Sequence, residues 1–150
     1  MANTTPKPWL LVQAVQARLQ GISVANGYRT DLGAHVAVEA QQYEDTDQHL
    51  TIYTVGISPG KNNQRDRRVR ELQLSLEMSV PVVIGIDGVA NDHATVHQAI
   101  ADVEDALFDA GRITVVGALE AYVGDISVID RPNGLAYTAA ALQLHVEYLP

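Results

Sequence analysis

Residues 72–80, with the sequence LQLSLEMSV, alternate apolar and polar side chains without interruption. This period of two is typical of a β-strand with one face on a core and the other toward water or a partner. Residues 142–148, with the sequence LQLHVEY, repeat the pattern near the end of the chain. The sequence therefore predicts two long, half-buried strands. Pro81 follows the first of them and indicates a bulge, a sheet edge or the end of its ladder.

Shorter strands are expected on either side of this pair. Residues 35–43 and 49–56 both alternate, and the acidic link 44–47 between them (EDTD) is typical of a turn. An antiparallel hairpin is the simplest interpretation. Residues 113–116 and 122–129 are further strand candidates, and the sequence DRPNG at 130–134 predicts a turn after the second one.

Two amphipathic helices are predicted. Residues 7–20 follow a Thr- and Pro-rich start and place Leu11, Val15 and Leu19 on one stripe. A second helix is expected from Asn91 or Asp92 to about Ala110, before a glycine. Its apolar stripe would be buried, and its other face is acidic, with Asp102, Glu104, Asp105 and Asp109.

These elements indicate an α+β fold of two layers, in which two main helices pack on one face of a mostly antiparallel sheet. The chain has 150 residues, which is the usual size of one domain, so we expect a single domain over 1–150. A chain of this size buries about two-thirds of its unfolded surface, which is enough for a core without disulfides or metals.

Composition excludes several classes of function. The absence of Cys excludes disulfides and thiolate chemistry, and it fits a reducing compartment. No stretch approaches the roughly 18 apolar residues of a membrane span, and the N-terminus does not have the pattern of a secretory signal. We therefore expect a cytosolic product. A pI of about 4.9 argues against general coating of nucleic acid.

The charge distribution is uneven. The chain has a net charge of -8, yet a single segment holds five of its ten basic residues: Lys61, Arg65, Arg67, Arg68 and Arg70. Such a loop could contact nucleic-acid phosphates or an acidic patch on a protein, or it could be a solvated hairpin tip that prevents aggregation. It has no aromatic residues to stack on bases, so contact with a protein is the favoured functional interpretation. Arg67, Arg68 and Arg70 directly precede the 72–80 strand, and we expect two of them to share a side.

No catalytic or metal-binding constellation is apparent. His93 and His97 have helical i, i+4 spacing, but the residues between them lack the Glu of a zinc protease helix and no third ligand is evident. An exposed polar edge of the helix is the alternative interpretation. Carboxylates such as Asp125 and Asp130, or those of residues 44–47, lack a nearby nucleophile or base. The sequence SPGK at 58–61 lacks the full phosphate-loop pattern. We expect no catalytic residue, metal or cofactor.

Charge separation suggests how identical subunits could meet. If they contact head to tail, the basic loop of one could face the acidic helix face of the next, with Asp102, Asp105 and Asp109 at the interface. A contact of this heterologous type closes into a ring.

The pattern Tyr28-Arg29-Thr30-Asp31-Leu32-Gly33-Ala34-His35-Val36 follows the first helix and resembles the segment Y-x-T-x-x-G-x-x-V of small tail proteins of phages and prophages. The sequence ISPG at 57–60 beside a charged loop is similar to that group, as are the helix with Ala99-Ile100 and Ala106-Leu107 and the closing VEY at 146–148. The resemblance runs from about Leu10 to Tyr148. The chain therefore resembles the tail terminator, or tail completion, proteins of long-tailed phages.

This resemblance implies an α+β fold, a hexameric ring and no catalysis. The ring would cap the tail tube, end its polymerisation and offer a docking surface to the head–tail connector or another neck protein. DNA would pass through its lumen without sequence-specific binding, and no membrane is involved. The protein would belong to the virion tail or neck and would occupy the host cytoplasm during assembly. Two alternatives are a head–tail connector or other neck ring protein, and a regulatory α+β domain that binds a small molecule.

Overall fold

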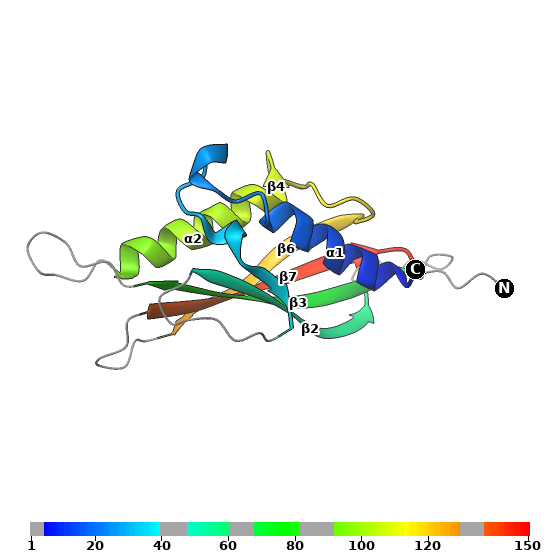
Figure 1. The fold of residues 1–150 in the computed structure, drawn as a ribbon. Helices are drawn as coiled ribbons and strands as arrows, with labels where there is room; N and C mark the ends of the chain where they lie inside the picture. Colours follow the sequence, from blue (N-terminus) through cyan, green and yellow to red (C-terminus); the bar gives the residue numbers. More distant parts are fainter. Residues whose placement is uncertain (1–4, 40–47, 61–67, 82–91, 130–136) are drawn as a thin grey trace, which may run out of the picture.

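The computed structural model describes residues 5–39, 48–60, 68–81, 92–129 and 137–150. It has two layers, with helices α1 (Lys7–Leu19) and α2 (Asp92–Leu107) lying on the same face of a five-stranded sheet (Figure 1). This arrangement confirms the α+β class and the placement of both main helices on one side of the sheet.

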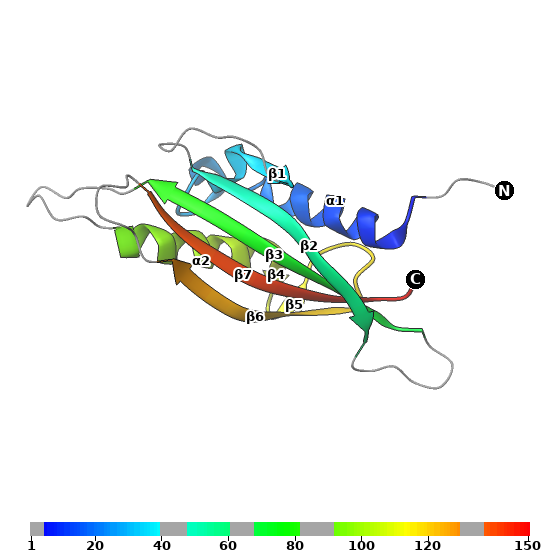
Figure 2. The ribbon, with the colours of Figure 1, turned by 90° about the horizontal axis from the view of Figure 1, so that it is seen from below.

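The strand order of the sheet is β1-β2-β3-β7-β6. Its members are β1 (Val36–Val38), β2 (His49–Pro59), β3 (Arg70–Pro81), β7 (Tyr137–Tyr148) and β6 (Glu120–Ile129). Figure 2 views the sheet from the face opposite the helices, with β2 and β6 on opposite sides of the central β3–β7 pair. The contacts β2–β3, β3–β7 and β7–β6 are antiparallel.

The alternating segment 72–80 lies in β3, which is the central strand of the sheet. β3 pairs with β7 along its whole length and with β2 from Arg70 to Ser79. Its apolar positions form the core under the helices and are at most 1 % exposed: Leu72, Leu74, Leu76, Met78 and Val80. Its polar positions lie on the face of the sheet that no described element covers, which we call the open face. Pro81 is the last described residue of the strand and lies opposite Tyr137, and the residues that follow it lie outside the described chain, so its expected role stays a prediction.

The first predicted hairpin is wrong. β1 contains only three residues and pairs with β2 in parallel, Val36 opposite Leu50 and Val38 opposite Ile52. β1 ends at Val38, and Glu39 has a φ of 68°, which turns the chain out of the strand direction. Residues 40–47, including the acidic link, lie outside the described residues.

The second helix ends earlier than predicted. α2 stops at Leu107, and the next residues form a small hairpin of β4 (Phe108–Asp109) and β5 (Arg112–Ile113) instead of a last helical turn. Ala110 and Gly111 both have positive φ, 50° and 79°, which is the backbone of a tight hairpin turn. The strand predicted at 113–116 is thus reduced to β5. The turn predicted at 130–134 lies outside the described residues.

No helix in the described parts of the chain is long and apolar enough to cross a membrane.

Candidate interaction surface

A pocket of about 220 Å³ lies where β2 ends and β3 begins. We call it the β2–β3 pocket, and its lining residues are Ile57, Ser58, Pro59, Arg68, Val69 and Arg70. The ladder between the two strands fixes its walls, because Ile57 lies opposite Leu72 and Pro59 lies opposite Arg70. One further hydrogen bond, from the Gly60 N–H to the Val69 carbonyl at 2.9 Å, extends this pairing toward the basic loop.

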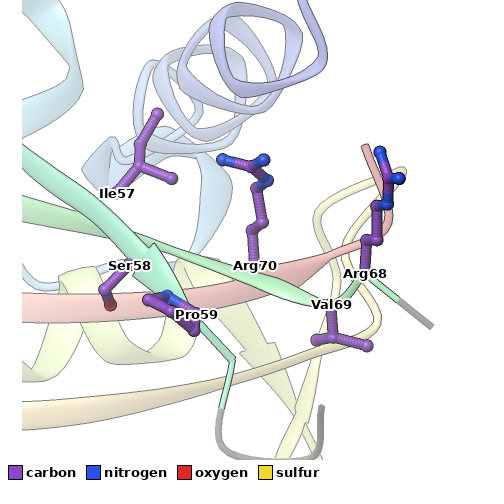
Figure 3. Close-up of a pocket in the computed structure, with 6 residues that line it drawn as sticks. All are labelled: Ile57, Ser58, Pro59, Arg68, Val69 and Arg70. Carbon is purple, nitrogen blue, oxygen red and sulfur yellow. The ribbon is translucent and has the colours of Figure 1, made fainter. Parts of the chain in front are cut away.

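Arg68 and Arg70 project to the same side of the sheet. Figure 3 shows both guanidinium groups on the side that carries α1, together with Ile57, whereas Ser58 and Val69 point to the opposite side. This confirms the expectation that two arginines of the segment share a side. Both are exposed, and neither forms an ion pair with another described residue. The pocket therefore presents two available cations beside apolar walls.

Apolar side chains are exposed near this pocket. Ile57 is 47 % exposed within it, and Trp9 and Leu10 of the first turns of α1 are 42 % and 47 % exposed. Figures 1 and 2 both place the start of α1 at the end of the molecule where β2 and β7 finish. Arg70 lies opposite Tyr148, the last residue of β7, and its charge partly offsets the burial that raises the pKa of the Tyr148 hydroxyl. Exposed apolar surface beside cations is typical of a protein-binding site.

The structure describes only part of the predicted basic segment. Arg68 and Arg70 form the start of β3 and its approach, as described above. Lys61, Arg65 and Arg67 lie outside the described residues, so their role as a partner-binding surface stays a prediction.

The predicted acidic helix face is different in the structure, because Asp102 is buried. Its side chain is fully shielded, and its carboxylate accepts hydrogen bonds from the Thr30 N–H and the Thr30 hydroxyl, both at 2.8 Å. It also accepts the Arg29 N–H and, at 2.9 Å, the Arg29 Nη1. The expectation that Asp102 lies on an exposed face is therefore wrong. Its carboxylate attaches the segment after α1 to α2.

The other two acids predicted at the subunit interface, Asp105 and Asp109, are exposed but have cations beside them. Asp105 forms an ion pair with Arg29 at 2.8 Å, and this contact, followed by the one to Asp102, raises the pKa of the Arg29 guanidinium. Asp109 lies on β4, directly opposite Arg112 of β5. An interface role for Asp105 and Asp109 stays a prediction. Because Arg29 and Arg112 lie beside them, the negative electrostatic potential at these acids is weaker than the sequence indicates.

Candidate metal ligands do not come together. No group of three or more His, Cys, Asp or Glu residues within the described ranges could hold a metal ion. His97 is exposed on α2, and the side chain of His93 lies outside the described part of the chain.

A network on the open face was not predicted. Glu71 of β3 has a side chain only 5 % exposed, and its Oε1 lies 2.7 Å from Nδ1 of His145 on β7. The His145 ring stacks on Tyr122 of β6 at a centroid distance of 4.5 Å, and the Tyr122 hydroxyl donates to Glu71 at 3.3 Å. All three occupy polar positions of alternating strands, but only the strand order reveals that they meet. The network joins three strands on a face that no described helix or strand covers.

Replacing His145 with alanine should lower the free energy of unfolding by about 2 kcal/mol, because the buried Glu71 carboxylate would lose its closest partner. Urea unfolding followed by circular dichroism measures this. Alanine at the exposed His97 is the matched control and should change stability by less than about 0.5 kcal/mol. Equal stability of the two variants would contradict a stabilising role for the network.

No protein-family model and no curated protein sequence matches the chain. Solved structures do match. The chain is similar to a chain of the virion of a native gene transfer agent particle, with a TM-score of 0.61 and 13% identity over 92% of this chain and 93% of that chain. It is also similar to a second solved structure, which carries no functional description, with a TM-score of 0.52 and 19% identity over 94% and 96% of the two chains. At these identities the likeness establishes a shared fold.

Proposed function

We propose that this chain is a structural protein of a phage or phage-like particle, and that it forms a ring that caps the tail tube. The observation that carries the proposal is the similarity of fold, over nearly the full length of both chains, to a chain of a gene transfer agent virion. The resemblance of residues 28–36 to tail terminator proteins supports the same role independently.

The surface of the molecule suits a role in assembly. Two exposed cations, Arg68 and Arg70, and the exposed Ile57 line the β2–β3 pocket, where they can contact another protein. Ile57 and Arg70 would contribute to such a contact together, since both project toward the same side (Figure 3). In this proposal the ring would end polymerisation of the tube and offer its other surface to the head connector.

A head–tail connector or other neck ring is the second candidate. It would use the same fold and a similar ring, but it would bind the head side of the particle and would not bind a bare tube. The two candidates therefore differ in which purified component the ring recognises.

The test uses tubes polymerised from the tail tube protein of the same particle. Added at about one ring per tube end, the purified chain should stop elongation and give an extra density at one end in negative-stain electron microscopy. Light scattering on the chain alone should give the mass of a ring. Tubes that lengthen unchanged would overturn the capping role. Binding to the isolated connector, without binding to tubes, would favour the second candidate.

A further inference from the structure

We propose that copies of this chain join side by side, with the β2 edge of one sheet against the β6 edge of the next. We call these the basic edge, which consists of Val55 and Ile57 of β2 together with Arg68 and Arg70 at the adjoining start of β3, and the acidic edge, which consists of Glu120, Asp125, Ile126 and Val128 of β6. The inference deepens the proposed function because it names the contact that would build the ring.

The two edges lie on opposite sides of the sheet (Figure 2). β1 covers only Leu50–Ile52 of β2, so the part of β2 from Tyr53 onward has no outer strand among the described residues. On the other side, β6 pairs with β7 and with no further strand of the described chain. A subunit therefore offers two different open edges, which is the requirement for a head-to-tail contact.

Both edges expose apolar side chains where a soluble monomer would need none. Val55 and Ile57 are 58 % and 47 % exposed, and Ile126 and Val128 of the other edge are 39 % and 38 % exposed. Ile57 lies opposite Leu72, and Ile126 lies opposite Leu142, so both project to the side of the sheet that carries the helices. Through β3 and β7, Ile57 lies level with Ala121, whereas Ile126 lies level with Ile52. Subunits placed side by side would therefore bring Val55 and Ile57 against the first half of the neighbouring β6.

The charges of the two edges are complementary. β2 contains no Asp or Glu, and the exposed Arg68 and Arg70 lie at its end of the sheet. β6 contains no Lys or Arg, and its Glu120 and Asp125 are both exposed. Contact between the edges would pair opposite charges around apolar side chains, an arrangement that favours association and fixes the register.

The acids of α2 and its hairpin are a poorer counterpart for the arginines. Asp102 is buried, Asp105 already pairs with Arg29, and Asp109 lies beside Arg112. Neither Glu120 nor Asp125 forms an ion pair with another described residue, so we assign the acidic side of the contact to them.

Side chains, more than backbone, would form this contact. The ladder shifts at Thr54/Gly56 in β2 and at Val123/Ile126 in β6, which places a bulge on each edge. Bulges bend an edge strand and hinder the continuous addition of another strand. The same contact closes into a ring when its repeated rotation returns to the first subunit.

The first experiment reverses the charge of one edge at a time. One variant combines Glu120→Lys with Asp125→Lys, and the other combines Arg68→Glu with Arg70→Glu. Each alone should associate at least about tenfold more weakly than the unmodified chain, because like charges would face each other. An equimolar mixture should recover assembly, since every contact in an alternating ring then pairs opposite charges. Arg112→Glu, outside both edges, is the control and should leave assembly unchanged.

Several results of this experiment would overturn the inference. They are assembly that survives both reversals, a mixture that fails to recover, and an unmodified chain that stays monomeric at every concentration. Loss of DNA binding in the arginine variant, with assembly intact, would likewise assign the cations to nucleic acid.

The second experiment uses the absence of cysteine in the chain. A chain carrying both Ile57→Cys and Ala121→Cys, which the ladder places at the same level, should form a disulfide-linked ladder beyond the dimer under mild oxidation, whereas each single variant should stay monomeric on a non-reducing gel. Dimers from a single variant would indicate a symmetric contact and overturn the inference. The capping assay is separate: a ring that cross-links as expected but does not cap tubes would overturn the proposed function and leave this contact intact.

Discussion

Replacing Asp102 with alanine is expected to lower the free energy of unfolding by about 3 kcal/mol or more, one of the two largest effects in this chain. The carboxylate is fully buried and accepts the N–H groups of Arg29 and Thr30 and the Thr30 hydroxyl. Alanine would leave these donors without an acceptor, and an unsatisfied buried donor costs more than the hydrogen bond itself contributes. The segment between α1 and β1 would also lose its attachment to α2.

The measurement is urea unfolding of Asp102→Ala beside Asp109→Ala, the same change at an exposed position. The control should stay within about 0.5 kcal/mol of the unmodified chain. Asp102→Asn should fall between the two, because an amide oxygen can accept one or two of the bonds while its NH₂ group faces other donors. Thermal midpoints should fall by about 2–4 °C for each kcal/mol lost in a chain of this size. Stability of Asp102→Ala equal to that of the control would refute the attachment.

Local patterns in the sequence predict most of the secondary structure correctly. The alternation of residues 72–80 and 142–148 identifies the two central strands, and the apolar stripe of residues 7–20 identifies α1. In each case the spacing of apolar residues within one segment identifies the helix or strand, so the prediction does not depend on which segments pack against it. The same holds for Arg68 and Arg70, which are two positions apart at the start of β3 and share a side.

Features that depend on contacts between distant segments could not be predicted in this way. Whether β1 and β2 pair in parallel or antiparallel depends on both strands together. The alternation of side chains along each strand is the same in either orientation, so it does not predict the direction. Asp102 lies 73 positions from Arg29, and a helical acid followed by Glu104 and Asp105 has the pattern of a solvated face. The Glu71–His145 pair is 74 positions apart, so it is apparent only from the register of β3 with β7.

The tail-protein motif in residues 28–36 has a structural explanation at each of its fixed positions. Tyr28 packs against the core, Thr30 donates to Asp102, and Val36 begins β1. Gly33 is buried against the end of α1, and its N–H donates to the Ile22 carbonyl at 2.9 Å. The motif therefore describes how the chain leaves α1 and enters the sheet. The fold explains its fixed residues without a binding partner.

Gly33→Ala tests this explanation and should destabilise the chain by at least about 3 kcal/mol. A Cβ at this position would lie 2.6 Å from the Leu19 carbonyl oxygen and 2.7 Å from those of Gln20 and Ile22. All three are backbone atoms at the end of α1, so no side chain can rotate away to make room. The helix end or the start of β1 would have to move, and both are attached to the core.

Gly56→Ala is the matched control for this substitution. A Cβ there would meet nothing within 4 Å, and the residue lies at the bulge of β2 with a φ outside the left-handed region. Removing a glycine at such a site restricts the unfolded chain and should change stability by less than about 1 kcal/mol, in the stabilising direction. Urea unfolding of both variants measures the difference in their free energies of unfolding. If Gly33→Ala proves as stable as Gly56→Ala, the close approach of the 28–36 segment to α1 does not explain why the motif requires glycine.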